Sequence, residues 1–305
     1  MATIFLQVLL PILVLIGCGW IVDRRWRLDL ATLVRLNIYL FVPAFIFFEV
    51  VHSSIDSSVA LKVMGFTVCI VAGMFICSAL IGRLLGYPVA QTRSLQLATM
   101  FYNSGNYGVP LMTLAYPLQG PLLQVFVVLT QNISCFTVGL LLASSTKHQG
   151  WRTLLPMLRQ VSLWAVGTAL LVRWFHVPVQ EWRWLWVPLE YLHGALVGVA
   201  LVTLGVQLSQ TRVRQSFARL GWALGLRLLG GPAVALALVP LFGFRGEIAA
   251  IMILSSGFPT AVNTALLAHE FEADSAFAAA VVFYSTLGSM VTVTVLIALL
   301  KGHVG

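Results

Sequence analysis

Apolar stretches of about 20 residues recur along the whole chain, separated by short polar breaks. Because a helix rises about 1.5 Å per residue, a stretch of this length crosses the hydrocarbon core of a bilayer. Of the 305 residues, 59% are hydrophobic and only 9% are charged, whereas a soluble domain carries about 25% charged residues. The sequence therefore predicts an all-α polytopic membrane protein, with the lipid bilayer as its main partner and no sizeable soluble domain.

Glycine, proline and charged residues mark the ends of ten predicted spans. The spans lie near residues 3–22, 30–50, 59–82, 94–116, 121–144, 154–175, 185–208, 217–242, 247–268 and 275–300. The first is predicted to be a retained span and not a signal peptide, since its charges, Arg24, Arg25 and Arg27, follow the apolar run. Ten spans place both termini on the same side of the membrane.

The lysine and arginine residues indicate which side that is. With the N-terminus outside, 13 of the 18 basic residues lie at cytoplasmic ends of spans and 5 at outer ends, as the positive-inside rule requires. We therefore predict that both termini are extracytoplasmic. The net charge of +8 is explained by this orientation signal, so no nucleic-acid partner is expected.

The basic connection between Lys147 and Arg159 divides the chain into two five-span halves, residues 1–150 and 151–305. Because each half has an odd number of spans, the second half enters the membrane from the opposite side. An internal repeat would therefore be inverted, as in many secondary transporters.

The fourth span contains the run Asn-Ser-Gly-Asn-Tyr-Gly-Val-Pro-Leu at residues 103–111. Pro110 removes a backbone donor and the glycines relax the helix, so polar backbone groups are freed within the membrane. The amides of Asn103 and Asn106 offer donors and acceptors that suit a carboxylate or a polar organic solute. The alternative is a kinked helix whose asparagines pack against a neighbour.

The ninth span repeats this pattern as Ser-Ser-Gly-Phe-Pro-Thr-Ala-Val-Asn at residues 255–263. Two broken helices at matching positions of two halves predict a transport site near the membrane midplane. The N-termini of the half-helices would direct their positive dipole ends toward an anion.

These two runs resemble the bacterial auxin efflux carrier family, within the bile/arsenite/riboflavin transporter superfamily. The resemblance implies ten helices in two inverted five-helix repeats, with helices 4 and 9 unwound and crossing at the substrate site. It also implies a scaffold of helices 1, 2, 6 and 7, a moving core of helices 3–5 and 8–10, an elevator mechanism and a homodimer formed through the scaffold. The expected location is the bacterial inner membrane.

The resemblance maps the family's crossover residues onto Asn103, Asn106, Pro110, Pro259 and Asn263. Pro43 corresponds to a proline segment that faces the site, although it could equally be only a kink. Tyr102 and Tyr107 flank the crossover asparagines and are candidates for contact with a ring of the substrate.

The absence of acidic residues inside these spans bears on whether transport is coupled to a cation. Neither crossover, nor the third or tenth span, has an interior Asp or Glu, and hard cations prefer such oxygen ligands. An anion gains about 2.3 kcal/mol per 100 mV on leaving a negative interior. We therefore predict uncoupled, potential-driven export of a small organic anion, possible substrates including auxin-like indole acids and malate. The alternatives are a proton- or sodium-coupled carboxylate symporter and an anion channel.

No cofactor, metal site or enzymatic activity is expected, because no nucleophile and base pair or metal motif is present. For the remaining ionisable residues near outer helix ends, we favour a solvated position at the interface over a role in proton coupling: Glu49, His52, Glu190 and His193. For Arg35 and Arg227 we favour snorkelling to the cytoplasmic surface over a role in attracting anions to an inward mouth. Gly194, Gly198 and Gly205 form a small-residue face that predicts close packing or dimerisation.

Overall fold

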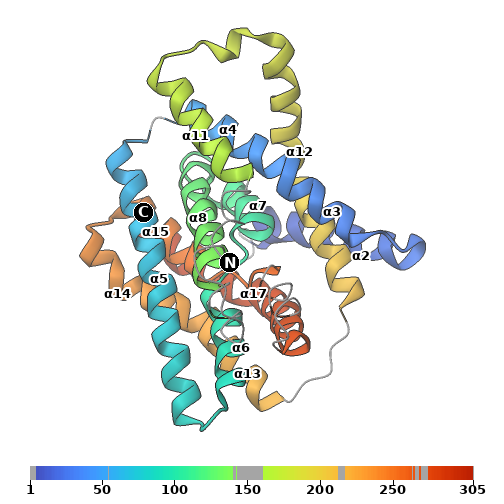
Figure 1. The fold of residues 1–305 in the computed structure, drawn as a ribbon, viewed down its shortest axis with the longest axis vertical. Coiled ribbons are helices and arrows are strands. Elements are labelled where there is room, and N and C mark those ends of the chain that lie inside the picture. The colour runs from blue at the N-terminus through green and yellow to red at the C-terminus, as the bar shows by residue number, and fades with distance from the viewer. Residues whose placement is uncertain are drawn as a thin grey trace.

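The computed structural model describes residues 5–53, 55–139, 142, 161–211, 217–262, 264, 268 and 274–304, and every regular element in these ranges is a helix (Figure 1). The all-α prediction is thus confirmed. Within the described residues, seven helices are long and apolar enough to span a membrane: Leu6–Trp26, Leu30–His52, Ser57–Leu84, Gly120–Gly139, Arg183–Gln210, Arg219–Phe242 and Ala276–Lys301. Val161–Trp174 and Gly246–Ser256 are shorter apolar helices. The arrangement of ten spans in two inverted repeats stays a prediction.

A first group of helices surrounds α12, which packs against α2, α3 and α4, while α11 packs against α4. Its members are η1 (Phe5–Leu9), α2 (Leu10–Trp26), α3 (Leu30–Leu36), η2 (Asn37–Phe41), α4 (Val42–His52), α11 (Val161–Trp174), η6 (Val179–Glu181) and α12 (Arg183–Gln210). In Figure 1, α4, α11 and α12 lie together at the top of the molecule. A buried hydrogen bond from Asn37 Nδ2 to Thr203 Oγ1, 3.0 Å long, ties η2 to α12.

Two glycines determine how closely α2 approaches α12. A Cβ atom on Gly19 would collide with the Val202 carbonyl, and one on Gly205 would collide with the Ile16 carbonyl. The backbones therefore touch, which small residues at helix interfaces permit. Gly194 and Gly198, in contrast, have no atom within 4 Å of an added Cβ, so only Gly205 of the predicted small-residue face serves packing within the described chain.

A second group packs around α5, which contacts α6, α8 and α14, while α17 contacts α6, α13 and α15. Its members are α5 (Ser57–Leu84), α6 (Val89–Met100), η3 (Ser104–Gly108), α7 (Val109–Ala115), α8 (Gly120–Ser134), η4 (Cys135–Gly139), α13 (Phe217–Gly225), η7 (Leu226–Gly230), α14 (Gly231–Phe242), α15 (Gly246–Ser256) and α17 (Ser275–Val304). The two groups meet where η3, α7 and α8 contact α4 and α12.

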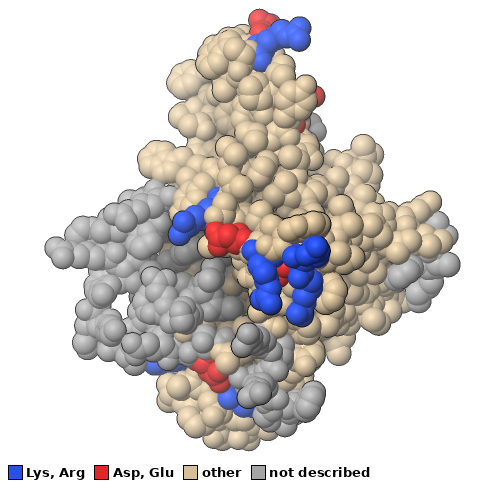
Figure 2. Space-filling model, turned by 90° about the vertical axis from the view of Figure 1, so that its right-hand side faces the viewer, with Lys and Arg blue, Asp and Glu red and all other residues tan. Residues whose placement is uncertain are grey.

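The surface is that of a protein surrounded by lipid. Large apolar side chains are exposed along α5, among them Leu61, Val68, Ile76 and Leu80. Figure 2 shows a face on which the charged side chains gather in a few small groups, with wide uncharged areas between them. An uncharged band of this kind is stable against hydrocarbon but not against water.

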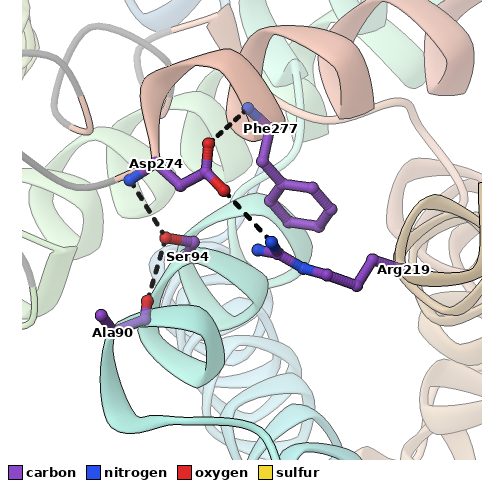
Figure 3. A network of polar contacts seen from close by, with 5 residues as sticks. All are labelled: Ala90, Ser94, Arg219, Asp274 and Phe277. Carbon is purple, nitrogen blue, oxygen red and sulfur yellow. Dashed lines mark hydrogen bonds and ion pairs between the residues drawn. The ribbon is translucent and has the colours of Figure 1, made fainter. Parts of the chain in front are cut away.

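At one end of the second group, a polar network joins α6, α13 and α17 (Figure 3). Asp274 accepts a 3.2 Å hydrogen bond from the Arg219 guanidinium and a 3.0 Å bond from the Phe277 amide at the start of α17. The Asp274 amide donates to Ser94 Oγ at 3.4 Å. Arg219 also lies 4.4 Å from the centre of the Phe277 ring. Its exposed fraction of 19% makes this a partly solvated ion pair.

Candidate substrate site at the helix crossover

Two helices are interrupted, and their interruptions lie side by side. Helix α6 ends at Met100 and the chain becomes helical again at Ser104; α15 ends at Ser256 and is followed by a non-helical segment at 257–261. The backbone N–H of Asn103 donates to the Pro259 carbonyl at 2.7 Å, and the backbone N–H of Ala261 donates to the Phe101 carbonyl at 3.0 Å. This short antiparallel bridge satisfies backbone groups that the two breaks would otherwise leave unpaired within the membrane.

Gln124 of α8 holds the two interruptions together from the side. Its Nε2 donates to the Ser104 carbonyl at 2.8 Å, while its Oε1 accepts from Ser255 Oγ at 3.1 Å. A Cβ on Gly108 would lie 2.7 Å from this Nε2 and 2.6 Å from the Phe258 ring. A glycine at position 108 is therefore required for α8 and Phe258 to reach the crossover.

A cavity of about 310 Å³ opens beside the first interruption, between the two helix groups. Tyr102, Asn103 and Asn106 lie on the side of the second group, together with Gln131 of α8. The opposite wall is formed by residues of the first group, Val34, Ile38, Tyr39, Val42, Val161 and Ser162. A volume of this size matches the smaller binding sites for organic molecules.

Two amide groups at this cavity have donors without acceptors. Asn103 is 6% exposed and Gln131 is 3% exposed, yet neither Asn103 Nδ2 nor Gln131 Nε2 has a hydrogen-bond partner among the described residues. Gln131 Oε1 is occupied, because it accepts from the Tyr102 amide at 3.4 Å. A buried donor left unpaired costs about 1–3 kcal/mol, so both groups favour a ligand that supplies oxygen acceptors.

Some of the predicted site residues line the cavity and others do not. Tyr102, Asn103 and Asn106 line the cavity, and Pro259 contributes the carbonyl that accepts from the Asn103 amide. Asn263 lies outside the described residues.

The other three predicted residues do not belong to the described cavity wall. Tyr107 is buried in the hydrophobic core, with its ring 5.6 Å from that of Phe258. Pro110 is buried in the first turn of α7. Pro43 is buried in the first turn of α4, next to Val42, which does line the cavity.

Sequence reasoning missed the two glutamines of α8. They carried a signal, since Gln124 and Gln131 are seven residues apart in an apolar span and therefore lie on the same face of a helix. A polar face inside an apolar span points toward protein or a cavity and not toward lipid.

The prediction that Arg227 snorkels to the surface is wrong. Its side chain is 0% exposed, so it does not reach an inward mouth either. Nη1 donates to the Thr99 carbonyl at 2.5 Å and Nη2 donates to the Ser256 carbonyl, while the guanidinium carbon lies 5.1 Å from the centre of the Tyr102 ring. Because the carbonyls at the ends of two broken helices accept hydrogen bonds from the guanidinium, the charged side chain is stabilised inside the protein and does not extend to the membrane interface.

Glu49 and His193, which we expected to be solvated at the interface, are partly exposed and lie against each other. His193 Nε2 lies 2.8 Å from Glu49 Oε1, and the side chains are 25% and 15% exposed. The His193 ring stacks on those of Phe45 and Phe48. The pair links α4 to α12 within the first helix group.

The fold and the cavity define a class, that of helical membrane proteins with paired broken helices beside an internal polar site. Comparison with known proteins is consistent with a transport function. Residues 187–297 match the family described as membrane transport protein. A protein of Methanothermobacter thermautotrophicus described as an uncharacterized transporter is 26% identical over 291 residues, which cover 94% of this chain and 95% of that protein. Both comparisons support the membrane transport family that the two motifs predict, and both point to a transporter.

Proposed function

We propose that this protein exports a small organic anion, a carboxylate, through the cavity at the crossover. The observation that carries the proposal is the pair of unpartnered amide donors, Asn103 Nδ2 and Gln131 Nε2. A carboxylate has only acceptors when it is ionised, and its two oxygens would pair both donors.

The electrostatics of the cavity also favour an anion. No Asp or Glu is found among the described residues that line it. The helical segment formed by η3 and α7 begins at Ser104 in the cavity wall, and the N-terminus of a helix carries a positive partial charge of about half a unit. This partial charge acts in a region of low dielectric constant.

The rest of the cavity suits the carbon skeleton of an organic acid. Val34, Ile38 and Val128 contribute aliphatic surface, and Phe101 and Tyr39 contribute aromatic rings. Apolar walls with a few polar groups are typical of sites for small organic ligands. An inorganic anion would leave this apolar surface without a partner.

Because the cavity lies between two helix groups, it supports alternating access. In this proposal the group around α12 is the scaffold and the group around α5 carries the site across the bilayer as an elevator. The proposal includes ten spans in two inverted repeats, both termini outside the bacterial inner membrane, and a homodimer formed through the scaffold. The unoccupied positions next to Gly194 and Gly198 on α12 are consistent with such a contact.

The test is transport by the purified protein in proteoliposomes. Radiolabelled indole-3-acetate, malate and other carboxylates would be supplied under an imposed membrane potential, proton gradient or sodium gradient. We expect saturable transport of at least one acid that follows the potential alone. Dependence on a proton or sodium gradient would show a coupled symporter, flux that fails to saturate would show a channel, and no flux of any acid would refute the proposed function.

A further inference from the structure

The fully buried arginine at the crossover has a function that its position in the chain does not suggest. Thr99 is the second-last residue of α6, and Ser256 is the last residue of α15. The Arg227 guanidinium donates to the carbonyls of both. It therefore joins the C-terminal ends of the two half-helices that lead into the interruptions.

The charge of this arginine is balanced without a carboxylate. Among the described residues, no Asp or Glu forms an ion pair with Arg227. A helix C-terminus carries about −0.5 of an elementary charge, so two such ends together offset about one positive charge. The face of the Tyr102 ring, 5.1 Å away, adds a cation–π contact.

The surrounding residues fit the guanidinium closely. A Cβ on Gly231 would collide with both the Ser256 carbonyl and Arg227 Nη2. Thus η7 and α14 approach the crossover closely only because residue 231 lacks a side chain.

Carbonyl oxygens at the C-terminal ends of broken helices are also the groups with which transporters bind a coupling cation. In this chain the guanidinium already occupies two of them. We propose that Arg227 is a resident cation that takes the place of a co-transported metal ion and fixes the selectivity of the site for anions. The inference rests on the proposed function, since it explains how an anion carrier works without a coupling ion.

Two consequences follow for transport. The crossover is charge-balanced when the cavity is empty, so the net charge carried across the membrane in one transport step equals the charge of the bound substrate. Tyr102 lines the cavity and its ring lies 5.1 Å from the guanidinium carbon, so this residue connects the arginine with the cavity wall.

The first experiment replaces the resident cation. We expect Arg227→Ala to reduce the transport rate about thirtyfold or more, because two buried carbonyls lose a charged donor. Guanidinium ion, added at millimolar concentration to fill the space, should restore transport and raise the thermal unfolding temperature of this variant but not of the wild type. Tetramethylammonium, which has no N–H donors, should do neither.

Three variants make the result specific. Arg227→Met fills the space without a charge, so guanidinium should not restore it. Arg227→Lys keeps the charge and should retain more transport than Arg227→Met even if Arg227→Ala does not fold. Arg219→Ala removes a partly exposed arginine from the same helical stretch and should be unaffected by guanidinium.

The proposal is overturned if Arg227→Met transports at the wild-type rate, if Arg227→Lys and Arg227→Met are equally impaired, or if wild-type transport requires sodium. The thermal unfolding measurement needs no substrate. If no acid is transported, the proposed function fails, while the effect of guanidinium on the unfolding temperature of Arg227→Ala still tests the role of the arginine.

Discussion

Two buried polar centres of this protein differ in whether their hydrogen bonds are complete. Asp23, at the end of α2, is 2% exposed and accepts hydrogen bonds from Ser209 Oγ at 2.6 Å, Gln210 Nε2 at 2.7 Å and the Leu28 amide at 3.0 Å. The cavity at the crossover instead leaves Asn103 Nδ2 and Gln131 Nε2 unpaired. A complete network stabilises the fold, whereas donors left unpaired beside a cavity support the proposed substrate site.

The largest effect is expected at the complete centre. Asp23→Ala removes the acceptor of these three bonds, and we expect the free energy of unfolding to fall more than in any of the other variants. Transport per folded molecule should be unchanged, since α2 and α12 do not contribute a described residue to the cavity wall. Thermal unfolding and specific transport rate would be measured on the same preparation. Asp29→Ala, which removes an exposed N-cap, is the matched control, with a smaller expected loss of stability.

The opposite pattern is expected at the cavity. Asn103→Ala removes one donor to the substrate, and we expect the transport efficiency to fall about tenfold to a hundredfold. The unfolding temperature should not fall, because the Asn103 side-chain donor has no partner among the described residues. The exposed Gln119→Ala is the control for removal of an amide elsewhere. A large loss of stability with normal transport would reverse the comparison between the two centres.

Charge sharpens the comparison further. Gln131→Glu replaces a donor with a group that repels an anion, whereas Gln131→Met removes the donor at similar volume. We expect substrate affinity to fall about tenfold more in the glutamate variant than in the methionine variant. Competition binding in detergent at pH 8 would measure both. Equal affinities would show that the substrate site does not favour anions.

The smallest effect is expected at the partly solvated network in Figure 3. Arg219→Met breaks the pair with Asp274, and surface ion pairs contribute about 0–1 kcal/mol. The unfolding temperature should fall slightly and transport should persist. A loss of transport would assign this network a part in the transport cycle.

Much of the helical architecture could be predicted from the sequence, because long apolar runs have few stable structures in lipid. The two interruptions could also be predicted, since Gly, Pro and Asn gather at residues 103–110 and 255–263. Their direct pairing through Asn103 and Pro259 could not, because hydrogen bonds between distant segments leave no local pattern.

Side-chain environments were harder to predict. Arg227 lies in an apolar run where snorkelling and burial give the same sequence pattern, and only the distant carbonyls of Thr99 and Ser256 decide between them. The i, i+7 spacing of Gln124 and Gln131 did indicate a polar face, but not which atoms would stay unpaired. Completeness of hydrogen bonding is a property of the folded structure.

The antiparallel bridge at the crossover has a mechanical consequence. Segments 101–103 and 259–261 come from opposite halves of the chain and are joined by two backbone hydrogen bonds. Pulling them apart would break both bonds and leave two backbone amides and two carbonyls without these partners. We therefore expect the two segments to move together, so that the two halves of the chain are mechanically coupled at the site.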